Sequence, residues 1–115
     1  MLIDWNDFLP KVKGSVKALA DASPETIVGY RQICAFDAKS GHLDEKTREL
    51  ISLAVAVTTR SDGCIANHTK RVIELGATRE EVADAMGVAV AMNAGAAVTY
   101  AGRVMDAFSA FSNKE

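Results

Sequence analysis

A cysteine and a histidine stand four positions apart, at Cys64 and His68, in a stretch that begins with Ser61. If this stretch opens a helix, the thiol and the imidazole lie on one face, one turn apart. The free backbone N–H groups at the start of that helix would favour a thiolate over a thiol. Glu49, twelve positions before Ser61, places a carboxylate inside an otherwise apolar segment. A thiol, a base and a buried acid are the components of a cysteine-based active site.

These residue types suit nucleophilic attack by sulfur. Only the thiolate is a good nucleophile, and an ordinary cysteine has a pKa of about 8.5. His68 can act as a base or as a cationic neighbour, and Glu49 can orient the imidazole or pass a proton through water. Attack on a peroxide would leave Cys64 as a sulfenic acid. Ser61 stands where a thiol-redox motif would carry its other cysteine, and a hydroxyl group cannot form a disulfide.

The elements that must position these residues are predicted to be α-helices only, without strand alternation. Apolar residues recur at helical spacing, and start and stop signals separate the segments. We expect about six helices: one from Trp5, one from Pro24 to about Ala38, one from Glu45 to about Thr59, one capped by Ser61 or Asp62 and ending at Gly76, one opened by a Thr78–Glu81 capping box, and one after a break near residues 93–95.

Length and composition indicate a single domain over residues 1–115. Two cysteines are too few for a secreted disulfide framework, and the acidic start does not resemble a signal peptide, so we expect a cytoplasmic protein. The formal charge of −2 is spread along the chain, which argues against a nucleic-acid partner. No segment is interpreted as membrane-spanning, because Asp84 and Asn93 interrupt the longest apolar stretch.

Alanine and glycine are concentrated between residues 83 and 102. Small side chains let helix axes approach closely, and a helix that is apolar on most faces has to be covered all round. We therefore expect this stretch to form a buried helix pair. Because a chain of 115 residues has little material to cover such a pair, a homo-oligomer is predicted.

Three segments closely resemble the carboxymuconolactone decarboxylase-like family, and within it the alkylhydroperoxidase D-like branch. They are Leu43–Val57, Asp62–Lys70 and Leu75–Val82, and the resemblance extends over about residues 36–108. That branch has the pattern Glu, eleven residues, Cys, two residues, Cys, three residues, His. Glu49, Cys64 and His68 occupy three of the four places, and Ser61 occupies the first cysteine place.

The resemblance implies an all-α helical bundle that assembles into trimers or hexamers and reduces hydroperoxides with thiols. In that scheme Cys64 attacks the peroxide, and Glu49 and His68 relay protons. The position of Ser61 would hold the cysteine that resolves the sulfenic acid as a disulfide. The implied partners are a hydroperoxide or another small molecule and an external thiol reductant, with no cofactor and no metal. Full turnover is predicted to be impaired, because Ser61 cannot act as the resolving thiol.

Several interpretations stay open. Ser61 is either an engineered replacement of cysteine, or natural in an enzyme resolved by an external thiol or by Cys34, or a sign of lost activity. A lactone decarboxylase, with His68 as general acid and base, is the second hypothesis, and a non-catalytic scaffold is the third. Glu49 has an alternative role as a surface charge paired with Lys46 or Arg60. Cys34 is expected to be structural, on the apolar side of its helix, and Arg60 is placed to help hold an anionic substrate.

Overall fold

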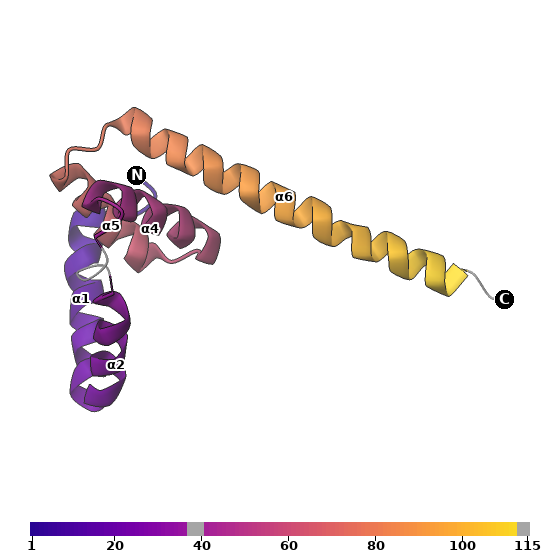
Figure 1. Ribbon diagram of the computed structural model, residues 1–115. Coiled ribbons are helices and arrows are strands. Elements are labelled where there is room, and N and C mark those ends of the chain that lie inside the picture. The colour runs from indigo at the N-terminus through magenta and orange to yellow at the C-terminus, as the bar shows by residue number, and fades with distance from the viewer. Residues whose placement is uncertain (37–40, 113–115) are drawn as a thin grey trace.

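The computed structural model describes residues 1–36 and 41–112, and in these ranges it contains helices and no strand. Figure 1 shows the helices nearest the N-terminus lying side by side as a hairpin, the helices that follow packed across one end of it, and the last helix running far beyond them. The all-α fold class predicted from the sequence is confirmed. The helices are α1 (Trp5–Ala22), α2 (Pro24–Cys34), α4 (Glu45–Thr59), α5 (Asp62–Glu74) and α6 (Arg79–Ser112).

The start signals identified in the sequence act as helix caps. The Asp44 carboxylate accepts a hydrogen bond of 2.7 Å from the backbone N–H of Thr47 at the start of α4. At the start of α6, Thr78 and Glu81 cap each other through reciprocal backbone-to-side-chain bonds of 2.9 and 3.1 Å. Such bonds satisfy N–H groups that the helix itself leaves unpaired. Local signals therefore fix where these two helices begin.

The predicted break near residues 93–95 is wrong, since α6 runs through it without interruption. The Asn93 amide donates to the carbonyl of Ala89 on the same helix and to the hydroxyl of Thr58 on α4, each at 2.8 Å. Gly95 lowers the stability of the helix by about 1 kcal/mol relative to alanine, and the neighbouring alanines, which are the best helix formers, offset this loss. The described ranges consequently hold five helices rather than six. Helix α2 ends at Cys34, and its predicted end near Ala38 lies outside the described residues.

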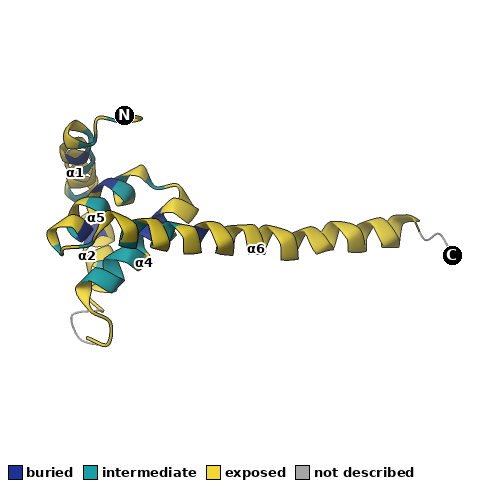
Figure 2. Cartoon of the chain, turned by 90° about the horizontal axis from the view of Figure 1, so that it is seen from above, coloured by how far each residue is buried: buried dark blue, intermediate teal, exposed yellow. Residues whose placement is uncertain are grey.

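The buried core is small and lies at one end of the molecule. Val72 on α5 is fully buried, and Leu53 on α4 is 3% exposed. Figure 2 shows that burial is confined to the packed body and the first part of α6. The buried apolar residues are Leu9, Ile27, Leu53, Ala56, Ala66, Val72 and Ala89. Helices α4, α5 and α1 therefore form the packed frame behind the residues singled out in the sequence.

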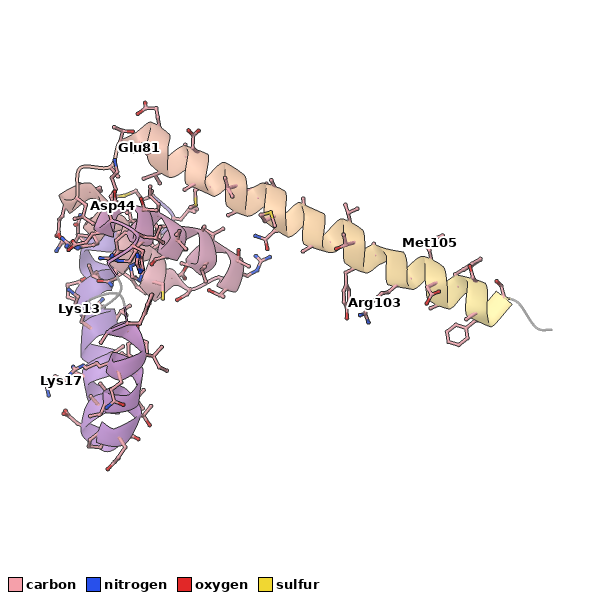
Figure 3. The ribbon with its side chains drawn as sticks, viewed as in Figure 1. Lys13, Lys17, Asp44, Glu81, Arg103 and Met105 are labelled. Carbon is pink, nitrogen blue, oxygen red and sulfur yellow. The ribbon has the colours of Figure 1, made fainter. Side chains whose placement is uncertain are left out.

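Every residue of α6 from position 90 to 112 is exposed in the single chain. The predicted burial of residues 83–102 as a helix pair is therefore wrong for the isolated chain, because α6 does not turn back on itself (Figure 1). By length and composition alone, α6 is also long and apolar enough to cross a membrane, as core helices of soluble proteins can be. Figure 3 shows Arg103 and Met105 projecting from this helix, far from the packed body.

Candidate active site

Three of the four residues singled out in the sequence come from two adjacent helices, and the fourth, Ser61, is the N-cap residue between them. Glu49 lies on α4, and Cys64 and His68 lie on α5, which packs against α4. Arg60 ends α4 in the left-handed conformation, with φ 57°, and the chain reverses there into α5. This reversal is what brings the middle of α5 opposite the carboxylate on α4.

The imidazole of His68 is held by Glu49. Its Nδ1 atom hydrogen-bonds the Oε2 atom of the Glu49 carboxylate. The two side chains are 26% and 22% exposed, so most of each is shielded from water. An ionised carboxylate only accepts hydrogen bonds, so beside an ionised Glu49 the Nδ1 atom carries the proton, and Nε2 keeps a lone pair when the ring is neutral. The pairing of Glu49 with Lys46 or Arg60, considered from the sequence, does not occur: Lys46 pairs with Glu81 instead, at 2.7 Å.

The Cys64 thiol is free and exposed, in the first turn of α5. Ser61 is the N-cap of this helix, and its hydroxyl accepts a hydrogen bond of 3.3 Å from the backbone N–H of Cys64. Cys64 therefore lies at the positive end of the helix dipole. The serine at the resolving position caps the helix without contributing a thiol.

Helix α1 approaches this turn closely because position 63 is glycine. A Cβ atom at Gly63 would lie 3.2 Å from a methyl group of Val12, closer than side chains normally pack. The absence of a side chain at this position lets α1 lie directly over the start of α5. Helix α1 can then form the second wall of a pocket beside the thiol.

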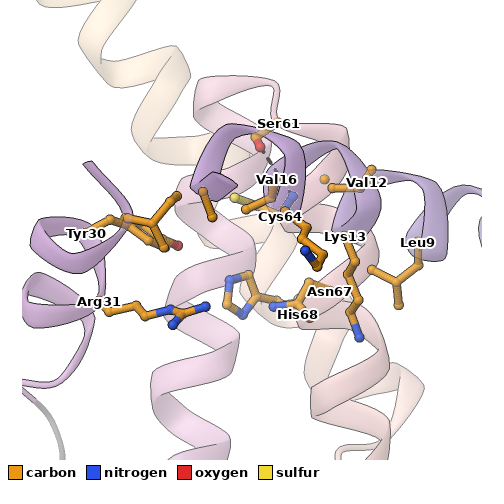
Figure 4. Close-up of a pocket in the computed structure, with 14 residues that line it drawn as sticks. Leu9, Val12, Lys13, Val16, Tyr30, Arg31, Ser61, Cys64, Asn67 and His68 are labelled. Atoms are coloured by element: carbon orange, nitrogen blue, oxygen red, sulfur yellow. Dashed lines mark hydrogen bonds between the residues drawn. The ribbon is translucent and has the colours of Figure 1, made fainter. Parts of the chain in front are cut away.

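That pocket has a volume of about 520 Å³ and contains Ser61, Cys64 and His68 among its lining residues. Figure 4 shows α5 supplying one side of the pocket and helices α1 and α2 supplying the other. Glu49 is absent from the lining and lies behind His68, where it supports the ring. The structure thus brings a thiol and an imidazole to one cavity and places the acid behind the imidazole.

Sequence reasoning missed the residues of the facing wall. Lys13 and Lys17 on α1, and Tyr30 and Arg31 on α2, line the pocket together with Asn67. No motif spacing connects them to Cys64, because they reach it only through the packing of the α1–α2 hairpin. Arg60, expected to help hold an anion, is not among the lining residues.

Tyr30 connects the pocket to the second cysteine. A hydrogen bond with Cys34 and the electrostatic interaction with the same residue raise the pKa of Tyr30, and partial burial and the proximity of Cys64 contribute in the same direction. Tyr30 is therefore a neutral hydrogen-bonding group over the whole physiological range. Cys34 is exposed, which does not support the expectation that it is a structural residue on the apolar side of its helix.

Comparison with known proteins agrees with this architecture. Residues 22–107 match the model of the carboxymuconolactone decarboxylase family, and the chain belongs to that family. An uncharacterized protein of Haemophilus influenzae is 44% identical over 109 residues, covering 95% of this chain and 96% of its own. A protein encoded in the cox locus of Paracoccus denitrificans is 42% identical over 97 residues, covering 84% of this chain and 87% of its own.

Two solved structures share the fold. The crystal structure of an apo carboxymuconolactone decarboxylase family protein from Legionella pneumophila superimposes with a TM-score of 0.71 at 33% identity, covering 95% of this chain and 97% of that one. A protein from Methanobacterium thermoautotrophicum gives a TM-score of 0.68 at 30% identity, covering 75% and 97%. The family and the alkylhydroperoxidase D-like resemblance stated from the sequence are consistent with these matches.

Proposed function

We propose that this protein is a thiol-dependent peroxidase in which Cys64 reduces hydroperoxides. The observation that carries the proposal is the pairing of His68 with Glu49 beside a free, exposed thiol in one pocket. The pair leaves a basic nitrogen on the side of the ring away from Glu49, which suits removal of a proton from a thiol.

The chemistry begins with proton transfer from the Cys64 thiol to Nε2 of His68. The thiolate attacks the terminal oxygen of the hydroperoxide: a sulfur–oxygen bond forms and the oxygen–oxygen bond breaks. The leaving alkoxide takes the proton from the His68 imidazolium and departs as an alcohol. Sulfur is oxidised to the sulfenic acid and the peroxide is reduced by the same two electrons. Glu49 stabilises the imidazolium that exists between the two proton transfers.

Recovery of the thiol requires an external reductant in this chain. A first external thiol condenses with the sulfenic acid to give a mixed disulfide and water. A second thiol attacks that disulfide, releases Cys64 and leaves as the oxidised reductant. Ser61 takes no part in these steps, because its oxygen cannot form the disulfide that a cysteine would form.

The test is peroxide consumption with dithiothreitol as the electron donor. The wild-type chain should consume cumene hydroperoxide, and Cys64→Ser should not. Cys34→Ser is the matched control, since it removes the other thiol of the chain, and it should retain the activity. Equal consumption by wild type and Cys64→Ser would refute the proposal.

A lactone decarboxylase is the second candidate, favoured by the positive charges of Lys13, Lys17 and Arg31 in the pocket wall. His68 could supply the general acid and base that this reaction needs, and no thiol is required. Decarboxylation of a carboxylated lactone that survives in Cys64→Ser and is lost in His68→Ala would favour this candidate over the peroxidase.

A further inference from the structure

The wall of the pocket that faces the thiol carries positive charge only. Among the described lining residues there are two lysines and one arginine, Lys13, Lys17 and Arg31, and there is no aspartate or glutamate. The chain as a whole has a formal charge of −2, so this local charge is opposite in sign to that of the protein. Converging like charges favour a bound anion.

Two of the three cations have no ion-pair partner among the described residues. Lys17 pairs with Asp21 at 2.9 Å, so its charge is partly offset within α1. Neither Lys13 nor Arg31 forms an ion pair in the part of the chain that the structure describes. Figure 4 shows the Arg31 side chain extending from α2 toward the region of His68. A guanidinium group can hold a carboxylate through two parallel hydrogen bonds.

The rest of the pocket is apolar. Leu9, Val12, Val16, Ala20 and Ile27 contribute to its lining. A volume of about 520 Å³ falls in the range of pockets that enclose a medium-sized organic molecule. The pocket therefore combines an apolar body, a positive rim and a nucleophilic sulfur.

We infer that the substrate is a hydroperoxide that also carries a carboxylate, an inference that rests on the proposed peroxidase function. The apolar wall holds the hydrocarbon chain, and Arg31 and Lys13 hold the carboxylate. The peroxide group then lies toward Cys64 and His68. The cations set specificity and take no part in the electron transfer.

The experiment compares a medium-chain hydroperoxy carboxylic acid with its methyl ester, below the micelle concentration and with dithiothreitol as reductant. The acid should be used with a kcat/KM about five- to tenfold higher than the ester, an effect typical of one partly exposed ion pair. Arg31→Gln should abolish this preference by raising KM for the acid. Lys11→Gln, on α1 outside the pocket lining, is the charge-matched control.

The possible outcomes distinguish the inferred carboxylate specificity from the proposed peroxidase function. Equal use of acid and ester by the wild type overturns the carboxylate inference and leaves the peroxidase function standing. Consumption of neither compound refutes the peroxidase function, and the carboxylate inference is then decided by calorimetric binding of the corresponding hydroxy acid and its ester. Preferential binding of the acid that is lost in Arg31→Gln supports it, and equal or absent binding overturns it.

Discussion

The Glu49 carboxylate on α4 and Nδ1 of the His68 imidazole on α5 form a hydrogen bond across 19 positions of sequence. The bond fixes the ring so that its other nitrogen is free to act on a proton. It also joins the two helices at the level of the pocket. The reactivity proposed for Cys64 therefore depends on a residue that does not line the pocket at all.

Replacing Glu49 by glutamine should slow peroxide reduction by roughly tenfold. A neutral amide can still accept the bond from Nδ1, but it does not stabilise the imidazolium as a carboxylate does. Stopped-flow measurement of sulfenic acid formation would give the rate. Glu45→Gln is the matched control, because Glu45 is also on α4 but pairs with Arg71 at 2.6 Å away from the pocket.

Removing the imidazole of His68 should slow sulfenic acid formation more than replacing Glu49, which holds the imidazole in place. We expect His68→Ala to lower the same rate constant by about 10²–10⁴-fold, the usual contribution of a positioned acid–base group. A loss no greater than that of Glu49→Gln would show that His68 does not move the proton.

Ser61→Cys should convert the site into a dithiol. The new thiol would stand at the N-cap, one turn from Cys64, and could condense with its sulfenic acid to form a disulfide and water. After treatment with one equivalent of peroxide, mass spectrometry should show a loss of two hydrogens in place of a gain of oxygen. Persistence of the sulfenic acid in this variant would mean that the two sulfur atoms do not meet.

Ser61→Ala tests whether Ser61 contributes to stability as a helix cap without contributing to the oxidation of Cys64. The variant loses one N-cap bond, which costs about 0.5–2 kcal/mol of unfolding free energy. The long bond of 3.3 Å places the expected loss at the lower end of that range. Urea titration should show this loss, while the rate of Cys64 oxidation should stay within twofold of wild type.

The Lys46–Glu81 pair should make stability depend on pH in the acid range. The bond from Lys46, aided by the backbone N–H of Thr78, holds the pKa of Glu81 below its ordinary value. The folded protein thus binds this proton less tightly than the unfolded chain does. The stabilisation is present above the ordinary glutamate pKa of about 4.3 and is lost as the pH falls through the lower folded value.

Melting temperatures between pH 3 and 7 would test this pair. Wild type should lose more stability than Glu81→Gln as the pH falls below about 4.5. Parallel curves for the two proteins would mean that the exposed pair contributes nothing measurable, as is common for surface ion pairs.

The sequence predicted the helices that carry the site because their signals are local. Asp44 and the Thr78–Glu81 pair are caps that act within one turn, so their effect does not depend on the rest of the fold. The four-residue spacing of Cys64 and His68 likewise needed only a helix to place both side chains on one face. The alignment of Glu49 with His68 followed from the family pattern rather than from any local rule.

Other features depend on contacts between distant residues and could not be predicted. Whether the chain breaks at Asn93 is decided in part by a hydrogen bond to Thr58 on α4. The cations Lys13 and Arg31 reach the pocket only because α1 packs over Gly63 and α2 packs on α1. The sequence contains these residues but no spacing that links them to Cys64.

Direct detection of a sulfenic acid at Cys64 tests most directly whether this residue is a peroxide-reactive thiol. Wild-type protein would be treated with a substoichiometric hydroperoxide, trapped with dimedone and mapped by mass spectrometry, with Cys34 as the internal control. We expect the dimedone adduct at Cys64, little adduct at Cys34, and strongly reduced adduct at Cys64 in His68→Ala. Equal labelling of both cysteines, or none at Cys64, would contradict it.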